Sequence, residues 1–144
     1  MAVLNGIDIV EINRIKKAME KSGQRFVEKI FTQSEILYCE SKKNGKYQSY
    51  AGRFASKEAF LKALGTGMSN GICLKDIEIL NEEFGKPNIV LSGKAKDFFV
   101  NSKGKNISLS ISHCRYYAVA NVLIETIDLQ IVNGEKHDNR QTDK

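Results

Sequence analysis

The sequence has few of the features that mark secreted, membrane-spanning or metal-rich proteins. Its three cysteines, Cys39, Cys73 and Cys114, are odd in number and lack metal-ligand spacing. No apolar run approaches the roughly 20 residues of a membrane-spanning helix. The first residues lack a basic leader, and Asp8 interrupts the apolar stretch that follows them. We therefore expect reduced thiols, no signal peptide and a cytoplasmic location.

The composition is that of a single compact domain. The 144 residues are 42% hydrophobic and 27% charged, which is enough apolar surface for a core and rules out disorder throughout. No internal repeat is visible. We expect residues 1–125 to form the domain. Residues 126–144, which are polar and lack aromatic side chains, form an extension that we expect to be partly disordered.

Positive charge is concentrated in the first half of the chain. The net charge is +5, and residues 14–62 contain 12 basic and 5 acidic side chains. Such a surplus can attract an acidic protein, a nucleic acid or a phosphate-rich small molecule, although a solvated basic face is also common. The charge alone leaves these alternatives open.

The residue pattern predicts an α+β fold, with one leading strand, three helices and then mostly strands. Thr32 and Glu35 form a capping box before the second helix, and Gly65 begins the turn that ends the third. We expect strands over 3–10, 76–80, 88–91, 107–113 and 116–125, and helices from 12 to about 23, over 33–41, over 47–64 and over 93–100.

The helix predicted over 47–64 has an unusual distribution of side chains. Small residues occupy one side, where charged residues would normally lie, while Arg53, Lys57 and Glu58 fall among the large apolar ones. This arrangement indicates a central helix that is contacted all round.

Two acidic residues, Asp8 and Glu58, are the strongest candidates for a site. Asp8 interrupts a buried strand, where it needs backbone amides, an arginine or a metal ion to offset burial. Glu58 has the i,i+4 spacing of a simple ion pair with Lys62, yet it lies on the same side as Phe54 and Leu61. Two inward carboxylates need a cation between them, and Mg²⁺ prefers such ligands together with phosphate oxygens.

The remaining candidates carry weaker signals. His113 ends an alternating strand, where a histidine is more often structural than catalytic, and Ser112 points to the other face and cannot pair with it. No G-x-S-x-G elbow is present. The glycines at 65 and 67 follow a helix, which is not the order of a phosphate-binding loop. The residues therefore predict a magnesium–phosphate site without naming the phosphate.

Several motifs together resemble one known family. They are Gly6-Ile7-Asp8-Ile9-Val10-Glu11 with Arg14, Phe31-Thr32-x-x-Glu35, Tyr50 to Ala59 (YAGRFASKEA), Lys62 to Gly67 (KALGTG), Gly85-Lys86-Pro87, and Ser110-Ile111-Ser112-His113. In this order they resemble the holo-acyl-carrier-protein synthases of the 4′-phosphopantetheinyl transferase superfamily, over about residues 1–125. Each motif alone is weak, but the combination is specific.

The resemblance implies a Mg²⁺-dependent reaction of fatty acid biosynthesis. It is the transfer of 4′-phosphopantetheine from coenzyme A to a serine of apo-acyl carrier protein, with release of adenosine 3′,5′-bisphosphate. The resemblance also implies that Asp8 and Glu58 bind Mg²⁺ and that Lys62 contacts the pyrophosphate. Glu58, or a metal-bound water near it, takes the serine proton.

Further roles follow from the same resemblance. Arg53, Lys62, Gly65 and His113 bind coenzyme A, with Arg53 and His113 at its nucleotide end. The basic residues Arg14 and Arg25 face the acidic carrier protein. The family is typically a homotrimer with active sites between subunits, and it implies neither a nucleic acid nor a membrane as a partner.

Three departures from the family pattern stand out. Ser56 stands where alanine is usual, Cys114 follows His113 where a polar residue is common, and the chain continues beyond the usual end. Two other functions fit the residues alone, namely a Mg²⁺-dependent phosphohydrolase and a non-catalytic basic binding module. An assay with coenzyme A and apo-carrier protein separates the three.

Overall fold

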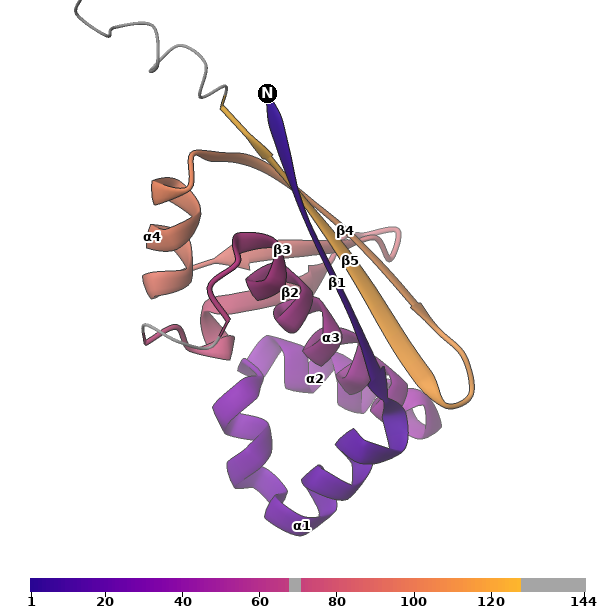
Figure 1. Ribbon diagram of the computed structural model, residues 1–144. Coiled ribbons are helices and arrows are strands. Elements are labelled where there is room, and N and C mark those ends of the chain that lie inside the picture. Colours follow the sequence, from indigo (N-terminus) through magenta and orange to yellow (C-terminus); the bar gives the residue numbers. More distant parts are fainter. Residues whose placement is uncertain (68–70, 128–144) are drawn as a thin grey trace, which may run out of the picture.

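The computed structural model of the protein describes residues 1–67 and 71–127 and has the α+β architecture that the sequence predicts (Figure 1). In chain order its elements are β1 (Ala2–Glu11), α1 (Ile12–Ile30), α2 (Gln33–Ser41), the 3₁₀ turn η1 (Lys43–Gly45), α3 (Lys46–Leu64), the 3₁₀ turn η2 (Leu74–Asp76), β2 (Ile77–Asn81), β3 (Pro87–Leu91), α4 (Gly93–Asn101), β4 (Gly104–His113) and β5 (Tyr117–Thr126).

The described strands form two antiparallel sheets. The larger has the order β1-β5-β4, so that the first and last strands of the domain are neighbours, and β2 and β3 form a separate hairpin. Asp8 lies opposite Ala120 of β5 in this register. Strand alternation turns Asp8 toward the same side of the sheet as the buried residues Gly6 and Val10.

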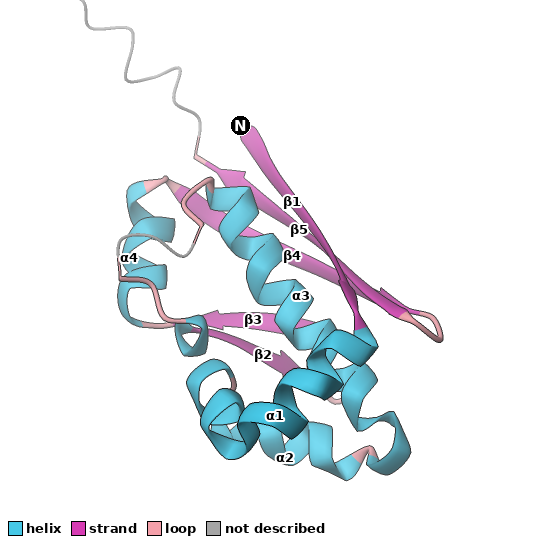
Figure 2. Ribbon diagram, turned by 60° about the horizontal axis from the view of Figure 1, so that its bottom comes forward, coloured by secondary structure: helices cyan, strands magenta, loops and turns pink. Residues whose placement is uncertain are grey.

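Helix α3 lies at the centre of the fold, as the side-chain pattern predicted. It packs against β1 and β5 on one side and reaches α1, α2 and β2 on others (Figure 2). Its small residues allow a close approach: a Cβ atom at Gly6 would lie 2.0 Å from the carbonyl oxygen of Ala59. Glycine at this position therefore lets β1 pack directly on the α3 backbone, which places Asp8 beside that helix.

Local signals placed α2 and the end of α3 correctly. The capping box is present, since Thr32 Oγ1 accepts from the Glu35 backbone N–H and Glu35 accepts from that of Thr32. Gly65 ends α3 in the left-handed conformation with φ of 75°. The first helix is broken at Gly23, where the sequence predicted its end, with φ of 56° and ψ of −141°. A second helical segment, which the sequence did not predict, follows directly and continues to Ile30, and the two segments together make up α1.

Strand β5 runs through Thr126, one residue into the range that the sequence assigned to the polar extension. Ile127 follows the strand, and residues 128–144 of that extension lie outside the described residues. Among residues 1–67 and 71–127, no helix is long and apolar enough to cross a membrane.

Candidate active site

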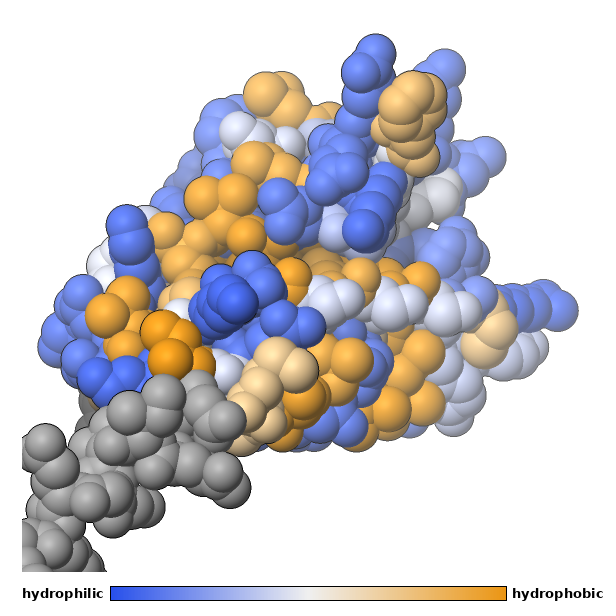
Figure 3. Space-filling view, turned by 90° about the horizontal axis from the view of Figure 1, so that it is seen from above, coloured by the Kyte–Doolittle hydropathy of each residue, from blue (hydrophilic) through white to orange (hydrophobic). Residues whose placement is uncertain are grey.

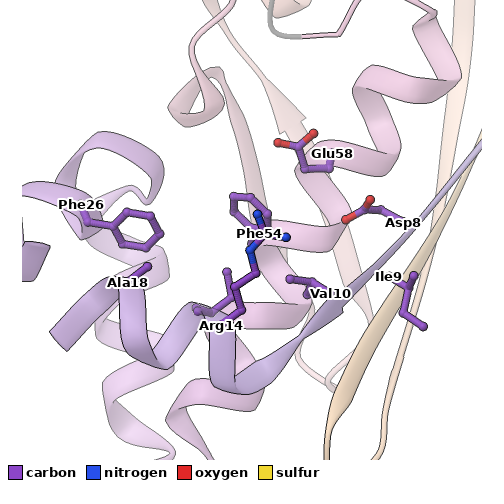
Figure 4. A pocket seen from close by; sticks show the side chains of 9 residues that line it. Asp8, Ile9, Val10, Arg14, Ala18, Phe26, Phe54 and Glu58 are labelled. Atoms are coloured by element: carbon purple, nitrogen blue, oxygen red, sulfur yellow. The ribbon is translucent and has the colours of Figure 1, made fainter. Parts of the chain in front are cut away.

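Asp8 and Glu58 line one cavity of about 360 Å³ between β1, α1 and α3. Figure 4 shows the two carboxyl groups near one another at one side of this cavity, with Arg14 and Phe54 beside them and Phe26 across from them. Asp8 comes from the strand and Glu58 from the helix, and the two residues are separated by 50 positions in the sequence. The fold thus brings together the two acidic residues that the sequence singled out.

Both carboxylates are partly withdrawn from water. The Asp8 side chain is 14% exposed, and its Oδ1 lies 2.9 Å from Nζ of Lys62, whose own side chain is 56% exposed. Among the described residues, Lys62 therefore forms its ion pair with Asp8 and not with Glu58, contrary to the simple i,i+4 alternative. This pairing places a cation at the rim of the cavity, where it can turn toward an anion.

Glu58 has a perturbed environment. Burial raises the pKa of its carboxyl group, the neighbouring charge of Asp8 raises it further, and Lys62 lowers it. Keeping Glu58 ionised beside the Asp8 carboxylate in a part-buried cavity therefore has an electrostatic cost. Groups with this combination of burial and like charge are typical of functional sites and of metal sites.

The two carboxylates in this cavity suit a hard metal cation that takes its remaining ligands from water and substrate. Within residues 1–67 and 71–127 no group of three or more His, Cys, Asp and Glu side chains could hold a metal by itself. Mg²⁺ is usually bound by one or two carboxylates, together with water and substrate phosphate oxygens. Asp8 and Glu58 supply those two carboxylates, and the open cavity beside them leaves room for the rest.

Arg53 lies in a different cavity, of about 500 Å³, between α2, α3 and the β2–β3 hairpin. It is buried, stacks at 4.0 Å on the ring of Tyr38 and donates to Oδ1 of Asn81. Its Nε is buried without a partner. His113 is exposed at the end of β4 and does not line this cavity. A single chain therefore does not bring Arg53 to the cavity of Asp8 and Glu58.

The other predicted residues lie near the first cavity or on the surface around it. Arg14 is exposed and lines the cavity itself. Arg25 is exposed on the part of α1 that follows Gly23, and Gly65 caps α3 directly after the turn that contains Lys62.

Sequence reasoning missed a buried ion pair between Lys57 and Glu35. Their side chains are 0% exposed, and Lys57 Nζ lies 2.6 Å from Glu35 Oε1. The sequence pattern marks Lys57 only as a charge among apolar residues, and Glu35 only as part of a capping box.

The apolar walls formed by Phe26 and Phe54 were also missed. They join the first cavity to an apolar one of about 370 Å³ lined by Ile30, Leu74 and others.

The fold and the paired carboxylates define a class of protein that comparison with known proteins confirms. A model of the 4′-phosphopantetheinyl transferase superfamily matches residues 5–121. The chain belongs to this superfamily.

Similar proteins within the superfamily include several holo-[acyl-carrier-protein] synthases. A holo-[acyl-carrier-protein] synthase of Ruminiclostridium cellulolyticum is 54% identical over 128 residues, which cover 89% of this chain and 96% of the relative. The solved holo-[acyl-carrier-protein] synthase of Helicobacter pylori in complex with coenzyme A is 37% identical, with a TM-score of 0.75 over 85% of this chain and all of that one. That of Bacillus anthracis, in complex with CoA (3′,5′-ADP), is 37% identical with a TM-score of 0.71 over 88% of this chain and all of that one.

Proposed function

We propose that this chain is a holo-acyl-carrier-protein synthase. It transfers 4′-phosphopantetheine from coenzyme A to a serine of apo-acyl carrier protein and releases adenosine 3′,5′-bisphosphate. The observation that carries this conclusion is the pair Asp8 and Glu58 in one cavity, with Lys62 at its rim, in a chain 54% identical to such a synthase. The reaction belongs to fatty acid biosynthesis, and the three free cysteines suit the cytoplasm in which it takes place.

Asp8 and Glu58 are the residues that would hold Mg²⁺. The ion, when bound with the coenzyme A pyrophosphate and water, spreads the negative charge that develops as the phosphate bond breaks. The donor set of the cavity fits this ion, because it combines two part-buried carboxylates with space for further oxygen ligands.

The residues around the carboxylates supply the remaining chemistry. The serine oxygen bonds to the phosphorus that carries pantetheine, and the bond from this phosphorus to adenosine 3′,5′-bisphosphate breaks. Lys62 leaves Asp8 to contact the pyrophosphate, which is feasible because the Lys62 side chain is half exposed and an ion pair of this kind is weak. Glu58, directly or through a water molecule, takes the proton of the serine.

Arg53, Gly65 and His113 bind coenzyme A in this proposal. The buried Nε of Arg53 has no partner, and the arginine faces a cavity at the α2–α3 junction, as expected of a residue that receives an anion. His113 lies at the exposed end of β4 and can donate to a phosphate. We assign Arg53 and His113 to the 3′-phosphate.

Substitution of His113 by alanine should weaken the use of coenzyme A but not of 3′-dephospho-coenzyme A. Loss of one charge-assisted hydrogen bond to phosphate raises the KM for coenzyme A about tenfold. Steady-state transfer assays with both substrates measure the difference, and because His113 is exposed the fold is unaffected. An equal rise for both substrates would remove His113 from the 3′-phosphate site.

We also propose a homotrimer whose active sites lie between subunits. The face of the large sheet that points away from α3 leaves Val3 (55%), Ile7 (59%) and Ile9 (64%) exposed. Apolar side chains also remain among hydrophilic ones on the surface seen in Figure 3. Exposed apolar patches of this kind mark protein interfaces. In such an assembly, Arg53 of one subunit contributes to a site whose Asp8 comes from its neighbour.

Mixed assemblies test the shared site. Asp8→Asn and the double variant Arg53→Gln/His113→Ala each impair one side of it. Co-expressed with different tags and purified as mixed trimers, they should recover about one third of the wild-type activity, because one of the three interfaces in every mixed trimer combines two unaltered sides. Mixed oligomers that are no more active than the separate variants would show that each site lies within one chain.

A single assay tests the proposed function against its two rivals. The purified chain is incubated with coenzyme A, apo-carrier protein and Mg²⁺, and the products are analysed by mass spectrometry. The proposal predicts a carrier protein heavier by one phosphopantetheine group together with adenosine 3′,5′-bisphosphate. Hydrolysed coenzyme A with unmodified carrier would indicate a phosphohydrolase, and neither product would indicate a binding module.

A further inference from the structure

The part of α1 that follows Gly23 has few anchors of its own. The break at Gly23 separates residues 24–30 from the first part of the helix. Of the buried residues of α1, only Ile30 lies in this segment. The segment nevertheless carries two residues near the site. Arg25 is exposed, and Phe26 lines both the cavity of Asp8 and Glu58 and the adjoining apolar cavity. Phe26 and Val27 are only partly buried against the core, so a contact at Ile30 adds to what fixes the direction of this segment.

Lys57 provides a contact at the end of this segment. Its ammonium group donates to the carbonyl oxygen of Ile30 at 2.8 Å, to Glu35 Oε1 at 2.6 Å and to the carbonyl oxygen of Leu74 at 3.1 Å. All three of its donors are thus used. Ile30 ends the segment, and both Ile30 and Leu74 line the apolar cavity. Through this one buried side chain, α3, which also carries Glu58, is hydrogen-bonded to the backbone of both residues.

Glu35 completes the network from the other side. Its Oε1 accepts from the Thr32 backbone N–H at 2.9 Å, and its Oε2 from that of Ile79 at 3.1 Å. Both side chains are fully buried, and burial lowers the pKa of Lys57 while Glu35 opposes that shift. Glu35 holds the Lys57 ammonium group in place at 2.6 Å, but of the two side chains only that of Lys57 is hydrogen-bonded to Ile30 at the end of α1.

We propose that Lys57 is a positioning residue for the carrier protein: by holding the Ile30 carbonyl it orients residues 24–30, and with them Arg25 and Phe26, for docking. This inference rests on the proposed function, with the acidic carrier protein docking on the exposed residues Arg14 and Arg25 of α1. Asp8 and Glu58 are held by the separate packing of β1 on α3 at Gly6 and Ala59. Loss of Lys57 should therefore affect docking more than chemistry.

Lys57→Met and Glu35→Gln test the proposal as a matched pair. Both disrupt the ion pair, but Glu35→Gln leaves an amine that can still donate to Ile30. Lys57→Met should raise the KM for carrier protein about tenfold or more, as expected for a misplaced binding element. The kcat and the KM for coenzyme A should stay within about twofold of wild type, and Glu35→Gln should remain close to wild type in all three constants.

Hydrogen exchange gives a second readout that does not depend on activity. Amides of residues 24–30 should exchange faster in Lys57→Met, while those of α3 near Phe60 should keep their protection. If this variant does not fold, Lys57→Met/Glu35→Gln, which buries no unpaired charge, takes its place with the same expected results.

Four results would overturn the inference: an unchanged KM for carrier protein, equal losses for both substrates, equal effects of Lys57→Met and Glu35→Gln, or failure of both Lys57 variants to fold. The last would assign the pair to stability alone. A wild-type chain that does not modify carrier protein would instead overturn the proposed function, and the exchange experiment would still report on Lys57.

Discussion

Replacing Asp8 by asparagine, or Glu58 by glutamine, is expected to lower the rate of phosphopantetheine transfer about 10²–10³-fold at saturating substrates. Each change keeps the shape of the side chain but removes a negative charge that, in the proposed function, binds Mg²⁺ next to the pyrophosphate. The loss should appear in kcat, because the interaction is strongest when charge develops on the breaking bond. Transfer assays at saturating coenzyme A and carrier protein measure it. Normal turnover in either variant would remove the paired carboxylates from the mechanism.

Thermal unfolding shows whether these losses come from the site or from the fold. Asp8→Asn removes an ion pair with the half-exposed Lys62, which is worth at most about 1 kcal/mol. Glu58 has a raised pKa, so protonating it stabilises the folded protein at low pH, and this stability is lost as the pH rises through that pKa. Glutamine stays neutral, so Glu58→Gln should be at least as stable as wild type at neutral pH. This gain in stability over wild type should disappear at acidic pH, where Glu58 is itself protonated.

Replacing Arg14 by glutamate is expected to raise the KM for carrier protein about tenfold or more, with little change for coenzyme A. Arg14 is exposed, lines the cavity of Asp8 and Glu58, and lies in the basic stretch from 14 to 62. Reversing its charge puts like charges opposite the acidic carrier protein and slows association. The effect should shrink as salt is added, because exposed charges are screened.

Lys16→Glu is the matched control for this variant. It makes the same change in net charge on α1, but Lys16 lies about 200° around the helix from Arg14. It is also exposed, with its closest partners at Glu20 and Tyr47. A comparable rise in the KM for carrier protein in Lys16→Glu would mean that overall charge, and not a docking face at Arg14, controls binding.

The parts of the fold that depend on local chemistry could be predicted from the sequence. The capping box at Thr32 and the left-handed Gly65 each set a helix boundary through contacts within a few residues. The small residues along α3 indicated a close approach, which the contact of Gly6 with Ala59 confirms. Asp8 and Glu58 were recognisable because a carboxylate in an apolar pattern needs a partner.

The parts that depend on long-range contacts could not be predicted in this way. Gly23 does stop a helix locally, but whether the chain turns away or resumes depends on the apolar cover that Phe26 and Ile30 find across the fold. The Lys57–Glu35 pair joins residues 22 positions apart through geometry that no local spacing encodes. Pairings of this kind become visible only once tertiary structure brings the elements together.

Binding of a divalent ion tests the central claim most directly. Mn²⁺ can replace Mg²⁺ at oxygen ligands, and its paramagnetic resonance signal distinguishes free from bound ion. In the presence of coenzyme A, the wild-type chain should bind about one Mn²⁺ per active site. Asp8→Asn and Glu58→Gln should each lose most of this binding while remaining folded. Binding at wild-type affinity in either variant would contradict the account, because the two carboxylates would then not share an ion.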